Sequence, residues 1–244
     1  SVGSIALAGF IPSSDAFQVT MLKQAGAIIL AKANMDELAR GVNGNSSLGG
    51  QTKNPYDLAR NPGGSSAGTA AAVTANFAAI GMGTDTCGSI RVPSSFNNLV
   101  GLRPSKGLSS IAGIIPLLHS KDVAGPLARS VRDVAIVMDI VAGFDPQDPA
   151  TALVKKRLFP GFVRGLGSVD LSSLRLGRLG NYFDDSEISE VNKVIDHALE
   201  ILETEGVTIV DIDTSLFENV QKEVQPKPPV GFEYKADMEQ YFES

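Results

Sequence analysis

The sequence predicts an α/β fold in which helices and strands alternate along the chain. Segments with helical spacing of apolar residues are followed by short apolar runs typical of buried strands, and the last third has a β-α-β pattern. The composition agrees with a folded domain, because 43% of the 244 residues are hydrophobic and 20% are charged. Global disorder is therefore excluded.

The first third of the chain predicts a helix, a strand, a long loop and a second helix. Apolar residues at helical spacing between residues 15 and 25 predict a helix that Gly26 ends, and the run Ala27 to Ala31 predicts a buried strand. From Gly41 to Gly68 the chain is rich in Gly, Asn, Ser and Pro, which predicts a long loop that is either functional or disordered. The small-residue run Thr69 to Ala79 predicts a tightly packed helix.

The middle of the chain alternates small residues with one amphipathic pattern. Glycines recur among small polar residues from Ile80 to Pro93, which disfavours a core strand and favours a turn that presents backbone amides. Asp133 to Val141 has apolar residues at helical spacing, and Gly143 to Pro149 closes that helix as a loop.

The last third predicts a β-α-β unit, because an amphipathic helical pattern lies between two short apolar runs. The three elements are expected at Leu174 to Leu179, Glu187 to Glu205 and Val207 to Ile212. The closing segment, Glu233 to Ser244, is polar and has no recognisable terminal cap.

Charge and cysteine content exclude several function classes. The net charge of −6 argues against nucleic acid as a direct ligand, because such binders need an excess of Lys and Arg. The single cysteine, Cys87, excludes an internal disulfide and fits a reducing compartment, and two histidines are too few for a His-rich metal site. No apolar run approaches the length of a membrane span. We therefore expect a cytoplasmic protein that binds neither membrane nor metal.

Three short patterns compete for the active site. Gly64-Ser-Ser-Ala-Gly68 has the form of a hydrolase nucleophile elbow with Ser66 as nucleophile, but residues 54–63 predict a loop where that motif needs a strand. His119 and His197 lie in a loop-like and a mid-helix segment, which favours structural or surface roles. Alternatively, the glycine-rich turn before the predicted helix is an anion cradle, although the Lys of a Walker motif is absent.

The third pattern pairs Ser65 with Ser89, because a small-residue helix between their two Gly-rich turns could bring them together. Their hydroxyls could then hydrogen-bond. A serine hydroxyl needs a base, which here would be a second serine relaying to a neutral lysine. The backbone amides around Ser89 could stabilise an oxyanion.

Several longer motifs resemble the amidase signature family, strongly over residues 1–150 and loosely beyond. The motifs run over Ala25–Asn34, Gly49–Asp57, Asn61–Gly68, Gly83–Pro93, Val100–Gly107 and Ala124–Asp133. The resemblance implies a mixed central β-sheet covered by helices, present here as a partial domain over residues 1–244 with its signature core at about 25–133. It also implies that the chain lacks an N-terminal part, which holds the family's catalytic lysine, and a part after Ser244.

The resemblance also implies roles for individual residues. Ser89 matches the family's acyl-forming nucleophile, and Ser65 matches the serine that follows a cis peptide bond and relays to the lysine. The implied oxyanion hole consists of the amides of Thr86, Cys87, Gly88 and Ser89. Gly64, Ser66, Asp85 and Arg91 are implied as supporting residues. Cys87 stands where the family usually has glycine. The lysines Lys23, Lys32, Lys53 and Lys106 are expected to be structural or solvated.

The implied reaction is hydrolysis of a carboxamide through an acyl-serine, without a metal or organic cofactor. The expected partner is a small-molecule amide, and a homodimer remains open. Because the lysine is missing, we expect this chain alone to be weakly active or inactive. One alternative is the A-type component of a glutamyl-tRNA amidotransferase, which would need partner subunits. The other is a non-catalytic scaffold of the same fold.

Overall fold

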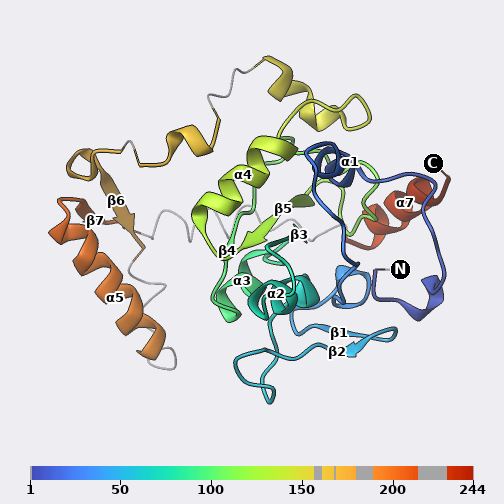
Figure 1. Ribbon diagram of the computed structural model, residues 1–244, viewed down its shortest axis with the longest axis horizontal. Coiled ribbons are helices and arrows are strands. Elements are labelled where there is room, and N and C mark those ends of the chain that lie inside the picture. The colour runs from blue at the N-terminus through green and yellow to red at the C-terminus, as the bar shows by residue number, and fades with distance from the viewer. Residues whose placement is uncertain (1, 157–160, 168, 180–188, 214–229, 244) are drawn as a thin grey trace. The chain divides into compact units, whose positions relative to one another are not determined.

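The computed structural model describes residues 2–156, 161–167, 169–179, 189–213 and 230–243. The chain divides into two compact units, one of Ser1–Arg164 with Val230–Ser244 and one of Gly165–Pro229. Helices and strands occur in both units, which confirms the α/β class (Figure 1). Within the described residues, no helix is long and apolar enough to cross a membrane.

A three-stranded antiparallel sheet lies at the centre of the first unit, in the order β3–β5–β4. Strand β3 (Ile80–Asp85) pairs with β5 (Val123–Ala128) over six residues, and Asp85 lies opposite Val123 at the end of the ladder. Strand β4 (Val100–Gly101) pairs with the other side of β5. All six residues of β5 are buried, so this strand forms the middle of the core.

Helices cover both faces of this sheet (Figure 1). On one face α4 (Val131–Val141) packs on β5, and α1 (Phe17–Gln24) packs on α4. On the other face lie α2 (Ala67–Thr74) and α3 (Arg91–Phe96). The predicted helices over residues 15–25 and 133–141 are thus confirmed. Helix α4 begins after Ser130, whose hydroxyl accepts from the Asp133 N–H at 3.1 Å, as an N-cap residue does.

Strand β3 corrects the prediction of a turn over Ile80 to Pro93. Successive side chains of a strand point to opposite faces, and the glycines of β3 share the face that meets α2. A Cβ on Gly81 would come within 2.4 Å of Thr69, and one on Gly83 within 2.6 Å of Ser66. The glycines therefore allow α2 to lie directly on the strand. Recurring glycines disfavour a strand in the sequence, but the packing of α2 on β3 requires them.

The predicted strand at Ala27 to Ala31 is wrong. These residues are outside any helix or strand, and Ile28 and Leu30 are 84% and 69% exposed. A strand needs a neighbouring backbone to complete its hydrogen bonds, and no described residue pairs with this segment. An apolar run alone does not determine whether a partner strand is present.

Two other predictions in the first unit are corrected in detail. Helix α2 starts and ends earlier than the predicted Thr69 to Ala79, since Asn76 takes a positive φ of 65°. The predicted loop at Gly41 to Gly68 contains a small hairpin of β1 (Asn45–Ser46) and β2 (Gly50–Gln51). The polar closing segment forms helix α7 (Val230–Glu243), which the sequence did not predict.

The second unit confirms the predicted β-α-β pattern. Strands β6 (Arg175–Arg178) and β7 (Thr208–Asp211) are parallel neighbours, and α5 (Ser189–Thr204) packs on β7. The first two residues of the predicted helix lie outside the described residues. Short 3₁₀ helices complete the described elements: η1 (Ile5–Leu7), η2 (Glu37–Ala39), η3 (Pro149–Lys156), η4 (Val163–Gly165) and η5 (Leu171–Ser173).

The packing of helix α4 in the core contributes to the free energy of unfolding. Met138 is fully buried in a cluster with Leu22 and Val141. We expect Met138→Ala to lower the free energy of unfolding by about 2–5 kcal/mol, the usual cost of a large core truncation. Ile136→Ala is the matched control, because Ile136 is 42% exposed on the same helix. Urea unfolding of both variants tests this, and equal losses would show that α4 does not pack as described.

Candidate active site

The Gly-rich turn before α2 and the loop that follows β3 lie side by side. The N–H of Ser66 donates to the carbonyl oxygen of Ser89 at 3.2 Å. The Ser66 hydroxyl accepts from the N–H of Thr84 at 3.3 Å and so ties the turn to the end of β3. Ser65 and Ser89 are therefore held on adjacent segments, as the pairing of the two serine turns requires.

Ser65 is fully buried on this turn, and its hydroxyl has no hydrogen-bond partner within the described part of the chain. The Gly64–Ser65 peptide bond is cis. The hydroxyl–hydroxyl bond that the sequence allowed between Ser65 and Ser89 is thus not formed. Buried polar atoms are nearly always hydrogen-bonded, so an exception calls for an explanation, and a catalytic role is one.

Asp36 holds the backbone of the Ser65 turn, although sequence reasoning did not identify it. Its N–H donates to the Ser65 carbonyl oxygen at 3.1 Å, and its buried carboxylate accepts from the N–H of Gly44 at 2.8 Å. A Cβ on Gly64 would lie 1.9 Å from the Asp36 carboxylate, so only glycine fits there. The two segments are in van der Waals contact at this point.

Asn34 makes a second connection between the same segments. Its carbonyl oxygen accepts from the N–H of Gly68 at 2.8 Å, in the first turn of α2. Its side chain accepts from the Ser46 hydroxyl and donates to the Thr52 hydroxyl, both at 2.8 Å. An Asn and an Asp two residues apart after an apolar run are the available sequence signal, because both side chains commonly bond to loop backbone.

Asp85 organises the loop on the Ser89 side. Its carboxylate is fully buried and accepts from the N–H groups of Gly88 at 2.7 Å and Ile90 at 3.1 Å. It also forms ion pairs with Arg91 at 3.1 Å and Arg103 at 3.3 Å. Burial alone would raise the pKa of Asp85, but the hydrogen bonds from Arg91, Ile90 and Gly88 outweigh it and lower the pKa below its ordinary value. The loop backbone is thus wrapped around an ionised carboxylate.

These contacts decide which loop amides are available to a ligand. The Gly88 N–H is engaged by Asp85, whereas the N–H groups of Thr86, Cys87 and Ser89 have no acceptor among the described residues. Ser89 is 7% exposed and its hydroxyl is likewise without a described partner. A hydroxyl next to several free N–H groups is an arrangement that can attack a carbonyl and stabilise the resulting oxyanion.

The other sequence candidates lie in settings that favour structural roles. The elbow interpretation lacks its strand, since residues 55–66 contain none, and the Ser66 hydroxyl is engaged by Thr84. His197 forms an exposed contact with Glu200 on α5. Lys106 donates to the carbonyl oxygens of Asp122 and His119, and burial lowers its pKa. It does not hydrogen-bond to Ser65 Oγ, which has no partner among the described residues.

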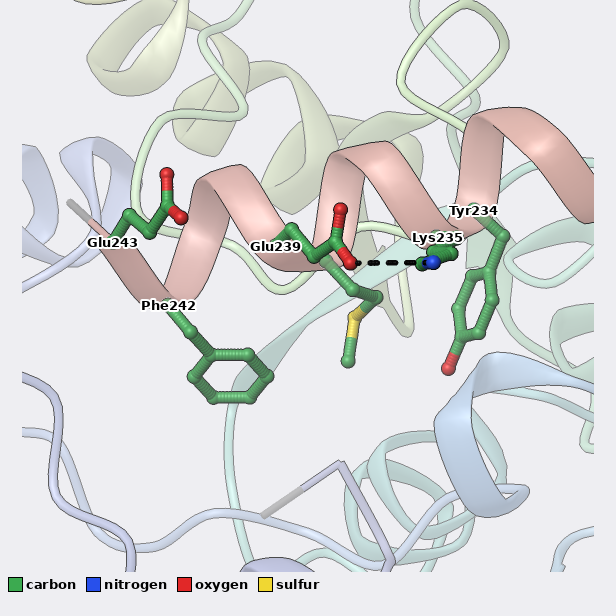
Figure 2. Close-up of a pocket in the computed structure, with 6 residues that line it drawn as sticks. Tyr234, Lys235, Glu239, Phe242 and Glu243 are labelled. Carbon is green, nitrogen blue, oxygen red and sulfur yellow. Dashed lines mark ion pairs between the residues drawn. The ribbon is translucent and has the colours of Figure 1, made fainter.

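Among the described residues, neither a metal-binding cluster nor the surface hollow beside α7 coincides with the serines. The described residues contain no group of three or more His, Cys, Asp or Glu side chains that could hold a metal ion. Figure 2 shows an open hollow along one side of α7, lined by Tyr234, Lys235, Glu239 and Phe242 among others. Lys235 and Glu239 form an ion pair at 3.7 Å there. None of the candidate site residues lines this hollow.

Comparisons with known proteins place the chain in a family. Residues 1–226 match the family model described as Amidase. The A-type subunit of the glutamyl-tRNA(Gln) amidotransferase of Bdellovibrio bacteriovorus is 38% identical over 216 residues, which are 88% of this chain and 43% of that protein. The native peptide amidase of Stenotrophomonas maltophilia matches with a TM-score of 0.85 and 38% identity over all of this chain and 50% of its own. An amidase family protein from Bacillus anthracis gives a TM-score of 0.88 and 32% identity over all of this chain and 48% of its own. The chain thus spans about half the length of these relatives.

Proposed function

The chain belongs to the amidase signature family, and from that premise we propose that the protein hydrolyses a carboxamide through an acyl-enzyme on Ser89. The observation that carries the proposal is the fully buried hydroxyl of Ser65, which has no hydrogen-bond partner among the described residues and lies on the segment that bonds to Ser89. A polar atom kept free of partners beside a second serine is suited to pass a proton rather than to hold the fold together.

In the proposed reaction, Ser89 Oγ attacks the carbonyl carbon of the amide while its proton passes through Ser65 Oγ to a neutral lysine. The oxyanion is stabilised by the N–H groups of Thr86, Cys87 and Ser89, which have no acceptor in the described part of the chain. Collapse of the tetrahedral intermediate breaks the C–N bond, and the amine or ammonia leaves with the proton. Water then hydrolyses the acyl-serine and releases the carboxylic acid. None of the described lysines donates a hydrogen bond to Ser65, because the Ser65 hydroxyl has no partner among the described residues.

Labelling with a fluorophosphonate probe, followed by peptide mass spectrometry, tests the proposed nucleophile. We expect the full-length protein to carry the adduct on Ser89, and the 244-residue chain alone to react at least about 100-fold more slowly without the proton acceptor. Ser94 is the internal reference, because its buried hydroxyl donates to the Ile90 carbonyl oxygen and should stay unlabelled. An unlabelled full-length protein would contradict the proposal and favour a non-catalytic scaffold.

A second candidate function is that of an A-type amidotransferase component, which acts with partner subunits. It is favoured by the 38–42% identity to proteins named as the A-type subunit of glutamyl-tRNA(Gln) amidotransferase. The two functions differ in the amide that is consumed. Release of ammonia from glutamine that rises when partner subunits are added would favour the amidotransferase, whereas release from simple carboxamides or peptide amides without partners would favour the amidase.

A further inference from the structure

Asp122 and Thr86 face each other where the central sheet ends. The antiparallel register places Asp85 opposite Val123 as the last pair of β3 and β5. Thr86 and Asp122 are the next residues beyond this pair, and the Thr86 hydroxyl donates to Asp122 Oδ1 at 2.5 Å. A hydrogen bond between two side chains thus extends the strand pairing by one residue, to Thr86, which is the first residue of the Ser89 loop.

The Asp122 carboxylate is built into this position. It is 7% exposed, and its second oxygen accepts from the N–H groups of Leu117 at 2.7 Å and Leu118 at 3.0 Å. Its own N–H donates to the Leu118 carbonyl oxygen at 2.8 Å. The described residues give it no ion pair, so three hydrogen bonds satisfy a buried acceptor that would be costly to leave unpaired.

The contact matters because the two ends of the Ser89 loop are held differently. Asp85 binds the N–H groups of Gly88 and Ile90 at the far end. At the near end, the N–H groups of Thr86 and Cys87 have no acceptor among the described residues, and the Thr86 hydroxyl is the side-chain anchor. An amide that must stay free to bind an oxyanion can be positioned through another atom of its own residue, and in Thr86 that atom is the hydroxyl oxygen.

We propose that Asp122 is a positioning residue that orients the Thr86 N–H toward the oxyanion formed at Ser89. The inference rests on the proposed amidase function. Asp122 also lies beside a small cavity that Thr86 lines. Other residues that line this cavity are Thr84, Ile111 and Leu117. A displaced Thr86 would weaken binding of the transition state while leaving the ground-state amide almost unaffected.

Thr86→Val and Asp122→Asn in the full-length protein test the proposal. Valine keeps the shape of threonine without the hydroxyl, and asparagine offers an N–H₂ group that cannot accept the bonds the carboxylate accepts. We expect kcat for a carboxamide to fall about 10–100-fold in each variant with KM nearly unchanged, somewhat less than the loss of a whole oxyanion donor. Thr86→Ser keeps the hydroxyl and should retain most of the wild-type kcat. The double variant Thr86→Val/Asp122→Asn should have a kcat no lower than that of the less active single variant, because both substitutions remove the same hydrogen bond.

Thr74→Val is the matched control, since the Thr74 hydroxyl donates to the Asn97 carbonyl oxygen at 2.8 Å away from the loop. It should leave kcat unchanged. Wild-type kcat in a folded Thr86→Val or Asp122→Asn protein would overturn the inference, as would a purely KM effect. If Thr86→Val does not fold, the kcat of Asp122→Asn is compared with that of Thr86→Ser, and equal values would overturn the inference. A wild-type protein that no fluorophosphonate labels at Ser89 would instead remove the proposed function itself.

Discussion

Ser89→Ala is expected to lower kcat for amide hydrolysis by about 10⁴- to 10⁶-fold in the full-length protein, the range found when a serine nucleophile is removed. The reason is that Ser89 forms the covalent bond in the proposed reaction, and neither of the described serine hydroxyls on the adjacent turn can replace it. The Ser65 hydroxyl is fully buried, and the Ser66 hydroxyl is bonded to Thr84. Initial rates of ammonia or amine release measure the effect directly.

The control for Ser89→Ala is Ser94→Ala, which removes a buried hydroxyl five residues further along the same segment. The Ser94 hydroxyl donates to the Ile90 carbonyl oxygen at 2.7 Å, a bond within α3 and the residue before it. Its loss should cost about 1 kcal/mol of stability and leave kcat within about twofold. Equal activity of the wild-type and Ser89→Ala proteins would show that the nucleophile is another residue.

The sequence predicted those elements whose own pattern determines them. Helix α4 has apolar residues at helical spacing, and the β6–α5–β7 unit has the alternation that such units require. Ser65 and Ser89 became the candidate site residues because two long motifs surround them. In each case the information lies within one continuous segment.

The missed features depend on contacts between distant segments. Gly81 and Gly83 disfavour a strand by themselves, and only the approach of α2 makes them necessary. Ala27 to Ala31 has the pattern of a strand without a described partner. Asp122 acts on Thr86, which lies 36 residues earlier, and no local pattern distinguishes it from a surface aspartate. Positioning residues are therefore the part of a site that a single sequence conceals most effectively.

Asp85→Asn is expected to impair both stability and activity, because it replaces the carboxylate around which the Ser89 loop is wrapped. The asparagine N–H₂ group would face N–H donors, so at least one of the Gly88 and Ile90 amides would lose its acceptor. Each buried donor left unpaired costs about 1–3 kcal/mol. We expect kcat to fall about 10²- to 10³-fold, because the amides of the oxyanion loop are no longer held in place. Denaturant unfolding and steady-state kinetics at pH 7 measure the two effects.

The pH dependence of the unfolding free energy shows how much of the stabilisation by Asp85 depends on its negative charge. Because its pKa in the folded protein is lowered from the ordinary value of 3.8, the folded protein binds the proton less readily than the unfolded chain does. The stabilisation is therefore fully present above pH 3.8 and is lost as the pH falls through the lowered pKa. The difference in unfolding free energy between the wild-type and Asp85→Asn proteins should shrink over that range. Asp15→Asn is the control: it removes an exposed ion pair with Lys23 and should change the free energy of unfolding by less than about 1 kcal/mol. A difference that stays constant down to about pH 2 would mean that the hydrogen-bond geometry, and not the charge, holds the loop.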